Sequence, residues 1–264
     1  MFQLQKDSIY QMPAHFGGII FDATSRAEQM VTMLSMTFET DRAVLERYIP
    51  EELELRAPEV TVALSQLTEI NWLAGGHYNM VSVTAPVRFT GKKDRVDASY
   101  MLVVWENRTD PILTGREQNG VPKIFANIED LHVCRPHYAT SVSYEGYTFL
   151  AMTFEAGSPL TGRDLEDIKL YFKSLDSIGW RYIPKVGAPG ADLSQFILFP
   201  GGMEVEKVYP GAGTFTWTEL SEMQNPRQHH IIRALASLPV KKMISTVMFE
   251  GKINLNTFVS RVLE

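Results

Sequence analysis

Short segments rich in β-branched and aromatic residues recur along most of the chain, and they predict strands. Many of them are bounded by Gly, Pro or Asp, which is typical of strand ends. Eight segments fit this pattern: Val60 to Leu67, Tyr78 to Phe89, Tyr100 to Trp105, Ala139 to Ser143, Thr148 to Phe154, Gln195 to Phe199, Met203 to Tyr209 and Gly213 to Leu220. Between the fourth and the fifth, Glu145-Gly146 predicts a tight hairpin turn.

Three segments have the pattern of a helix, and they are scattered along the chain. They span Asp41 to Tyr48, Leu165 to Phe172 and Arg227 to Leu238. The first begins at Thr40 or Asp41 as its N-cap and ends before Pro50. Many strands with few helices indicate the α+β class, centred on an antiparallel sheet that curls into a barrel. No repeat, low-complexity tract or charged linker divides the sequence, so residues 1–264 are predicted to form a single domain.

Composition narrows the classes of protein to consider. An apolar fraction of 45% is enough for a large core, and a formal net charge of −6 argues against nucleic-acid or anionic-membrane partners. No run of 18 apolar residues occurs, and Met1 to Asp7 lacks a hydrophobic signal region. The single cysteine, Cys134, excludes an internal disulfide and fits a reducing compartment. A cytoplasmic location is therefore predicted.

Lys123 carries the most specific chemical signal. It follows Pro122 directly and precedes the apolar residues Ile124, Phe125 and Ala126. Burial disfavours the charged form of a lysine, and the neutral amine is a nucleophile toward a carbonyl carbon. Our hypothesis is that Lys123 forms a Schiff base. The alternative is a solvated lysine in a surface turn.

The surrounding motif supports the hypothesis. Gly115-Arg116-Glu117, five residues and then Pro122-Lys123 resembles the active-site segment of the acetoacetate decarboxylase-like superfamily, in which the lysine after the proline is the Schiff-base residue. Activation of that lysine by desolvation or by a neighbouring cation is established for acetoacetate decarboxylase itself. Further matches occur in the family's order at Ile49 to Leu55, Pro86 to Gly91, Ile183-Pro184 and Leu238 to Ser245.

This resemblance covers roughly residues 13 to 255 and implies a fold and a chemistry. The expected fold is a closed, cone-like antiparallel β-barrel with a few peripheral helices and the lysine in an interior pocket. The expected activity is that of a carbon–carbon lyase without cofactor or metal. Members typically assemble from several copies, so a homo-oligomer is predicted.

The chain departs from the decarboxylating members at three positions. Ile124 stands where they carry a second lysine, and Met80 lies near the position of a glutamate. Their N-terminal arginine falls near Val31, with Arg26 as the nearest substitute. A retained lysine with changed polar neighbours suggests imine chemistry with a different outcome, because an iminium is an electron sink for several bonds.

Pyruvate bound as an imine can lose a methyl proton, and the resulting enamine can attack an aldehyde. We favour this aldol condensation and dehydration, which resembles the activity of pyruvate aldolase-dehydratase branches of the superfamily. The alternatives are decarboxylation of acetoacetate or another 3-oxo acid, and hydration of an unsaturated oxo acid. A non-enzymatic alternative is a barrel that binds an apolar ligand, with Lys123 incidental.

Four further residues are assigned to the candidate site. Arg116 could clamp a substrate carboxylate or form a structural salt bridge. Glu117 could orient that carboxylate or carry a proton, or it could share the structural salt bridge with Arg116, and an extended segment would place it on the same face as Lys123. Gln118 could donate hydrogen bonds to a substrate oxygen or face solvent, and Tyr78 could act as an acid on the pocket wall or be an ordinary barrel residue. Glu117 is thus predicted as catalytic beside Lys123, and the other three as substrate-binding.

Competing signals are weaker. Lys185 also follows a proline, but its neighbours are typical of a hydrated loop. Lys241 and Lys242 could supply the missing cation, although a solvated pair is the default. His132, Cys134 and His137 lack the spacing of a zinc site, so no metal is predicted.

Overall fold

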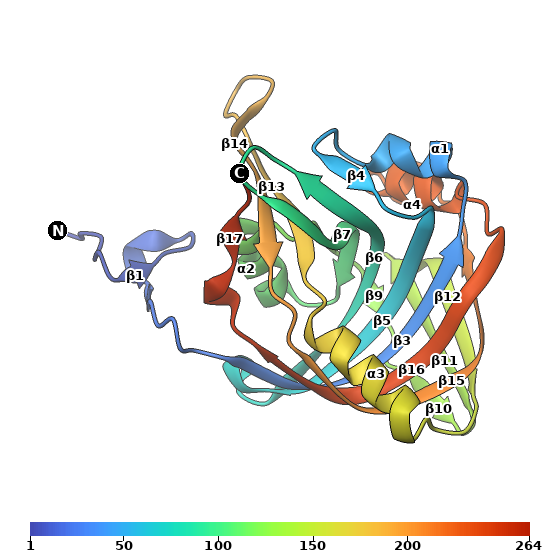
Figure 1. Cartoon of the computed structure of the whole chain (residues 1–264). Coiled ribbons are helices and arrows are strands. Elements are labelled where there is room, and N and C mark those ends of the chain that lie inside the picture. The colour runs from blue at the N-terminus through green and yellow to red at the C-terminus, as the bar shows by residue number, and fades with distance from the viewer.

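One 15-stranded sheet carries most of the chain in the computed structural model, which describes residues 1–264 (Figure 1). Its strands are β3 (Ala27–Glu39), β4 (Leu53–Leu55), β5 (Glu59–Ile70), β6 (Gly76–Thr90), β7 (Arg95–Glu106), β8 (Lys123–Phe125), β9 (Asn127–Ile128), β10 (His132–Cys134), β11 (His137–Tyr144), β12 (Tyr147–Ala156), β13 (Ser177–Pro184), β14 (Ala191–Phe199), β15 (Met203–Trp217), β16 (Lys242–Leu255) and β17 (Arg261–Val262). The main strand order is β10-β11-β12-β15-β16-β3-β5-β6-β7-β13-β14-β17. The short strands β4, β8 and β9 pair with β6, β7 and β11.

The predicted closed barrel is wrong, whereas the α+β class is confirmed. The sheet is open, because its terminal strands β10 and β17 lie at opposite ends of the strand order and do not pair with each other. It is also not wholly antiparallel, since β7 pairs in parallel with both β8 and β13. Both terminal strands are only two or three residues long, and short edge strands limit further pairing.

Alternation of side chains explains how the long strands pack. In β6, Val81, Val83, Ala85, Val87 and Phe89 are buried, and the residues between them are only half-buried. A strand directs successive side chains to opposite faces, so this spacing lines one face with apolar groups. That face contributes to a main core of 27 buried residues, which includes the fully buried Trp105.

Four α-helices complete the fold: α1 (Arg42–Leu45), α2 (Thr109–Asn119), α3 (Gly162–Lys173) and α4 (His229–Ala236). The three predicted helices correspond to α1, α3 and α4. Asp41 caps α1, since its carboxylate accepts hydrogen bonds from the amides of Ala43 and Val44. The predicted hairpin is confirmed, because Tyr144 pairs with Tyr147 around Glu145-Gly146. None of the helices is long and apolar enough to cross a bilayer.

Helix α2 was not predicted, and it contains the Gly-Arg-Glu segment. The alternation argument that would place Glu117 on the same face as Lys123 requires an extended segment, so it does not apply to a helix. Pro111 stands in the first turn, where its missing amide is tolerated, and Gly120 ends the helix with a positive φ of 67°. Helix α2 lies beside β7, β8 and β13 (Figure 1).

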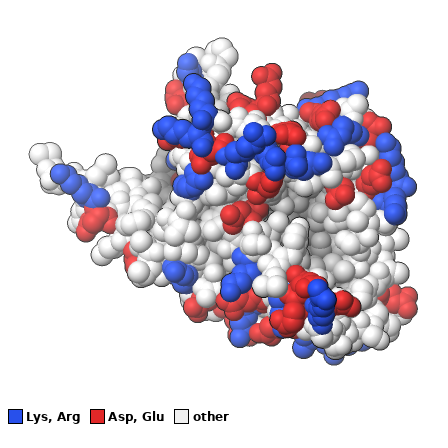
Figure 2. Space-filling model, viewed as in Figure 1, with Lys and Arg blue, Asp and Glu red and all other residues white.

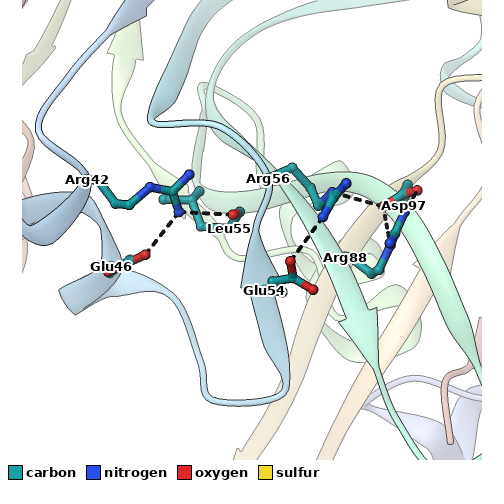
Figure 3. A network of polar contacts seen from close by, with 7 residues as sticks. All are labelled: Arg42, Glu46, Glu54, Leu55, Arg56, Arg88 and Asp97. Atoms are coloured by element: carbon teal, nitrogen blue, oxygen red, sulfur yellow. Dashed lines mark hydrogen bonds and ion pairs between the residues drawn. The ribbon is translucent and has the colours of Figure 1, made fainter.

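The surface carries charges of both signs. On the face shown in Figure 2, Lys and Arg alternate with Asp and Glu rather than forming a single-sign patch. Figure 3 shows one such network, in which Arg42 donates to Glu46 and to the carbonyl of Leu55, and Arg88 pairs with Asp97. Exposed ion pairs of this kind add little stability individually.

An N-terminal arm projects from the sheet (Figure 1). It carries a separate two-stranded hairpin of β1 (Ser8–Ile9) and β2 (Ile19–Ile20). Several of its large apolar side chains are exposed, among them Phe2, Phe16 and Ile20. Gln11 reaches the body of the protein, where its carboxamide oxygen lies 3.5 Å from the Thr114 hydroxyl in α2.

Candidate functional site

The candidate site forms where β7, α2 and β8 follow one another in the chain. Strand β8 returns parallel to the end of β7, so that Lys123 is in register with Val104. The amide of Val104 donates to the carbonyl of Pro122 at 3.1 Å, which fixes the backbone just before the lysine. The side chain of Lys123 then lies between the end of β7 and the helix that connects the two strands.

Lys123 is held by two oxygen atoms. Its Nζ lies 2.8 Å from Oε1 of Glu106, the last residue of β7, and donates to the carbonyl of Pro111 at 3.1 Å. Only 13% of the lysine side chain is exposed, and Glu106 is fully buried. The carboxylate oxygens of Glu106 have no hydrogen-bond donor apart from this ammonium. The two side chains therefore form a buried pair with no other polar partner for the acid.

Gly115 leaves space for the side chain of Lys123. A Cβ at this position would lie 2.6 Å from Cδ and Cε of Lys123 and 2.9 Å from Nζ. Carbon atoms normally approach to about 3.5–4.0 Å, so no larger residue fits without displacing the lysine. The glycine of the Gly-Arg-Glu motif thus provides space for the candidate nucleophile.

Burial dominates the electrostatics of Glu106. Desolvation raises the pKa of its carboxyl, and the neighbouring Lys123 ammonium opposes part of that rise. Tyr78 lies close enough to Glu106 for the carboxylate charge to affect its phenol. Burial and then the Glu106 charge raise the pKa of the Tyr78 phenol, so this group keeps its proton.

The predicted residues fall into two groups. Arg116 adjoins Lys123, since its Nη1 donates to the Lys123 carbonyl at 2.8 Å, and the guanidinium is otherwise exposed. Tyr78 is buried in β6 on the Glu106 side. Glu117 and Gln118 are half-buried in α2, and neither side chain makes an ion pair or hydrogen bond. The structure thus brings Lys123 together with Arg116 and, through Glu106, with Tyr78.

Glu106 was missed by sequence reasoning. It is the residue directly opposite Met80 in the pairing of β6 with β7. The acid that reaches the lysine therefore comes from the strand beside the one on which the resemblance placed a glutamate. The available signal was an isolated Glu directly after the apolar run that ends in Trp105.

The other positions near the expected site contain no replacement cation. Val31 is buried among apolar side chains, and Arg26 donates to the carbonyls of Thr24 and Ser25 in an exposed segment. Lys241 pairs with Asp41 at 3.1 Å.

Two competing sets of residues lie on the surface. Lys185 is exposed in the loop after β13, as predicted for a hydrated lysine. His132, Cys134 and His137 are exposed on β10 and β11, and no group of three metal-binding side chains occurs in the structure.

Comparison with known proteins gives the family. The family model of acetoacetate decarboxylase (ADC) matches residues 11–260. The chain belongs to the acetoacetate decarboxylase family. No curated protein sequence matches it.

Solved structures of this family share its fold. Acetoacetate decarboxylase from Legionella pneumophila subsp. pneumophila str. Philadelphia 1 is 18% identical, with a TM-score of 0.74 over 94% of this chain and 92% of that one. The enduracididine biosynthesis enzyme MppR complexed with pyruvate is 13% identical, with a TM-score of 0.69 over 96% and 95%. MppR complexed with the condensation product of pyruvate and imidazole 4-carboxaldehyde is 14% identical, with a TM-score of 0.67 over 90% and 89%.

Proposed function

We propose that this member of the acetoacetate decarboxylase family is a lyase whose Lys123 forms a Schiff base with the keto group of a small oxo acid. The observation that carries this proposal is the enclosure of Lys123, which is 13% exposed and has an acid at 2.8 Å. Burial disfavours the charged form of a lysine, and a neighbouring carboxylate can accept the proton that the ammonium gives up.

The favoured outcome is condensation of pyruvate with an aldehyde, followed by dehydration. Met80 and Val31 are apolar, and they lie near the positions at which the resemblance places a glutamate and an arginine of the decarboxylating members. The structurally similar MppR is complexed with pyruvate and with the condensation product of pyruvate and imidazole 4-carboxaldehyde, which supports this outcome. Decarboxylation of a 3-oxo acid and hydration of an unsaturated oxo acid use the same imine and are the alternatives, and the Glu106 carboxylate beside Lys123 is compatible with decarboxylation as well.

The remaining site residues receive proposed roles. Arg116 uses one Nη1 hydrogen on the Lys123 carbonyl, and its other donors are free to bind a substrate carboxylate. Tyr78 keeps its proton and can donate a hydrogen bond to a substrate oxygen. Glu117 and Gln118 lie one and two residues further along α2 and are proposed to contact the part of the substrate away from the imine. A single domain, a homo-oligomer and a cytoplasmic location stay predictions.

Reductive trapping tests the proposal. The protein is incubated with pyruvate and, separately, acetoacetate in the presence of cyanoborohydride, and the adduct is located by intact-mass and peptide analysis. We expect an adduct on Lys123 in the wild type and in Lys185→Ala, and none in Lys123→Ala. Lys185→Ala is the matched control because that lysine also follows a proline but is exposed.

Pyruvate and acetoacetate together distinguish condensation from decarboxylation. Trapping with pyruvate but no release of carbon dioxide from acetoacetate supports condensation, and rapid release supports decarboxylation. Folded protein that forms no adduct with either acid would contradict the Schiff-base mechanism.

A further inference from the structure

A buried acid beside the candidate nucleophile is not explained by packing alone. Glu106 is fully buried, and its carboxylate has no donor other than the Lys123 ammonium. Structural buried carboxylates usually accept several hydrogen bonds, because an unsatisfied charge in the interior is costly. An acid whose sole partner is the reacting amine is instead arranged to exchange a proton with that amine.

We propose that Glu106 is the acid–base residue that carries the lysine proton during imine formation. This inference rests on the function proposed for Lys123 and assigns its proton transfers to one group. Glu106 touches the reacting atom, since its Oε1 lies 2.8 Å from Nζ, within the reach required of a general base.

Imine formation begins with a proton transfer within the buried pair. The Lys123 ammonium gives one proton to the Glu106 carboxylate, which leaves a neutral amine and a neutral carboxylic acid. The amine nitrogen attacks the keto carbon, and the carbonyl π electrons move to oxygen. A proton then moves from nitrogen to that oxygen and gives a neutral carbinolamine.

Loss of water completes the imine. The nitrogen lone pair forms the C=N bond while the hydroxyl leaves with the proton held by Glu106. The products are one water, a protonated imine on Lys123 and the Glu106 carboxylate. The site begins and ends as an ion pair, so no net charge is created in the buried region.

The surroundings favour Glu106 over other acids for this role. Burial raises the pKa of its carboxyl, which favours the neutral acid that forms when Glu106 takes the lysine proton. The groups that face it are Lys123 from β8 and Tyr78 from β6, and the phenol of Tyr78 holds its own proton tightly. Arg116 on α2 binds the Lys123 carbonyl and not the acid.

The test compares Glu106→Gln, Glu106→Asp and the matched control Glu129→Gln, which removes an exposed charge from the loop after β9. Two rates are measured for each folded variant from low to high pH. One is reductive trapping of pyruvate on Lys123. The other is acetylation of Lys123 by acetic anhydride, which reports the neutral amine without any oxo acid.

Opposite changes are expected in the two assays. In E106Q the ammonium loses its counter-ion, so the midpoint of the acetylation profile moves to lower pH. Trapping at neutral pH nevertheless falls about 100-fold, at the lower end of the usual contribution of general acid–base catalysis. The shorter carboxylate of E106D can still exchange protons, so trapping in this variant should be faster than in E106Q. E129Q behaves as the wild type.

The outcomes separate this inference from the proposed function. Trapping in E106Q at the wild-type rate would show that Glu106 is only a counter-ion and would overturn the inference. If E106Q does not fold, Glu106→Ala takes its place, and trapping at the wild-type rate in that folded variant would likewise overturn the inference. Absence of trapping in the wild type itself would refute the Schiff-base function, whereas the acetylation profiles would still show whether Glu106 controls the protonation of Lys123.

Discussion

Replacement of Gly115 by alanine is the most direct test of how the helix positions the lysine. The new methyl group would lie 2.6 Å from Cδ and Cε of Lys123, about 1 Å inside the normal contact distance. The backbone of Gly115 is helical, so alanine introduces no strain there. The lysine side chain is the part that can move, and a shift of about 1 Å would stretch the 2.8 Å contact with Glu106 beyond hydrogen-bonding distance.

Stability and reactivity should respond differently to G115A. Alanine in a helix contributes about 0.5–1 kcal/mol relative to glycine. Separation of a buried ion pair costs up to about 3–5 kcal/mol, and less here because the lysine stays nearby and Glu106 can take up a proton. We therefore expect a net loss of about 1–3 kcal/mol in the free energy of unfolding. A misplacement of about 1 Å at a reacting atom can cost about 100-fold in rate.

The assay for G115A is reductive trapping of pyruvate beside urea denaturation. Trapping on Lys123 should fall about 100-fold while the protein remains folded. Leu113→Ala is the control, because this side chain of the same helix is 46% exposed and should leave trapping unchanged. Folded G115A protein that traps pyruvate at the wild-type rate would refute the reasoning.

Two further predictions concern stability. The buried Gln228 side chain accepts a hydrogen bond from the indole N–H of Trp105 and donates one to the carbonyl of Phe125. Both groups lose this partner in Gln228→Leu, so the free energy of unfolding measured in urea should fall by about 2–4 kcal/mol. An unchanged value would contradict the role of these two hydrogen bonds. Asp94 accepts hydrogen bonds from Arg261, which lower the pKa of its carboxyl below the usual 3.8. The contribution of this pair to the stability of the fold is therefore complete above pH 3.8 and is lost as the pH falls through the lowered pKa. Asp94→Asn should therefore lower the melting temperature by a constant amount above pH 3.8 and by less below it, and a difference that grows in acid would oppose this assignment.

Local patterns predicted the elements whose signals lie within one segment. Strand β6 alternates apolar and polar residues along most of its length, and α1 begins at a capping aspartate. Two central strands, β3 and β16, were missed. Strand β3 contains three methionine and two glutamate residues, which have little strand preference, and it is held in place by β16, more than 200 residues away in the chain. Such pairing depends on tertiary contacts that no local window contains.

Helix α2 escaped prediction for a related reason. It is polar along most of its length and shows no apolar stripe, so periodicity gave no signal. Pro111 near its start and Gly120 at its end would have marked it. The barrel expectation came from the many strand-like segments and from the family resemblance, but closure of a sheet is decided by whether its terminal strands meet. Here β10 and β17 do not pair, and neither is long enough to bridge a gap.

The position of the acid shows why the lysine was easier to find than its partner. A Schiff-base lysine is marked by its own chain neighbours, whereas a carboxylate needs only to arrive near Nζ from any strand. Met80 and Glu106 are directly paired across β6 and β7, and paired side chains on one face lie about 4.5–5.5 Å apart at Cβ. An acid on either strand can therefore reach the same space beside Lys123. The loss of the expected glutamate at Met80 is thus compatible with a retained proton acceptor, and the geometry of the sheet, not the motif, determines which residue supplies it.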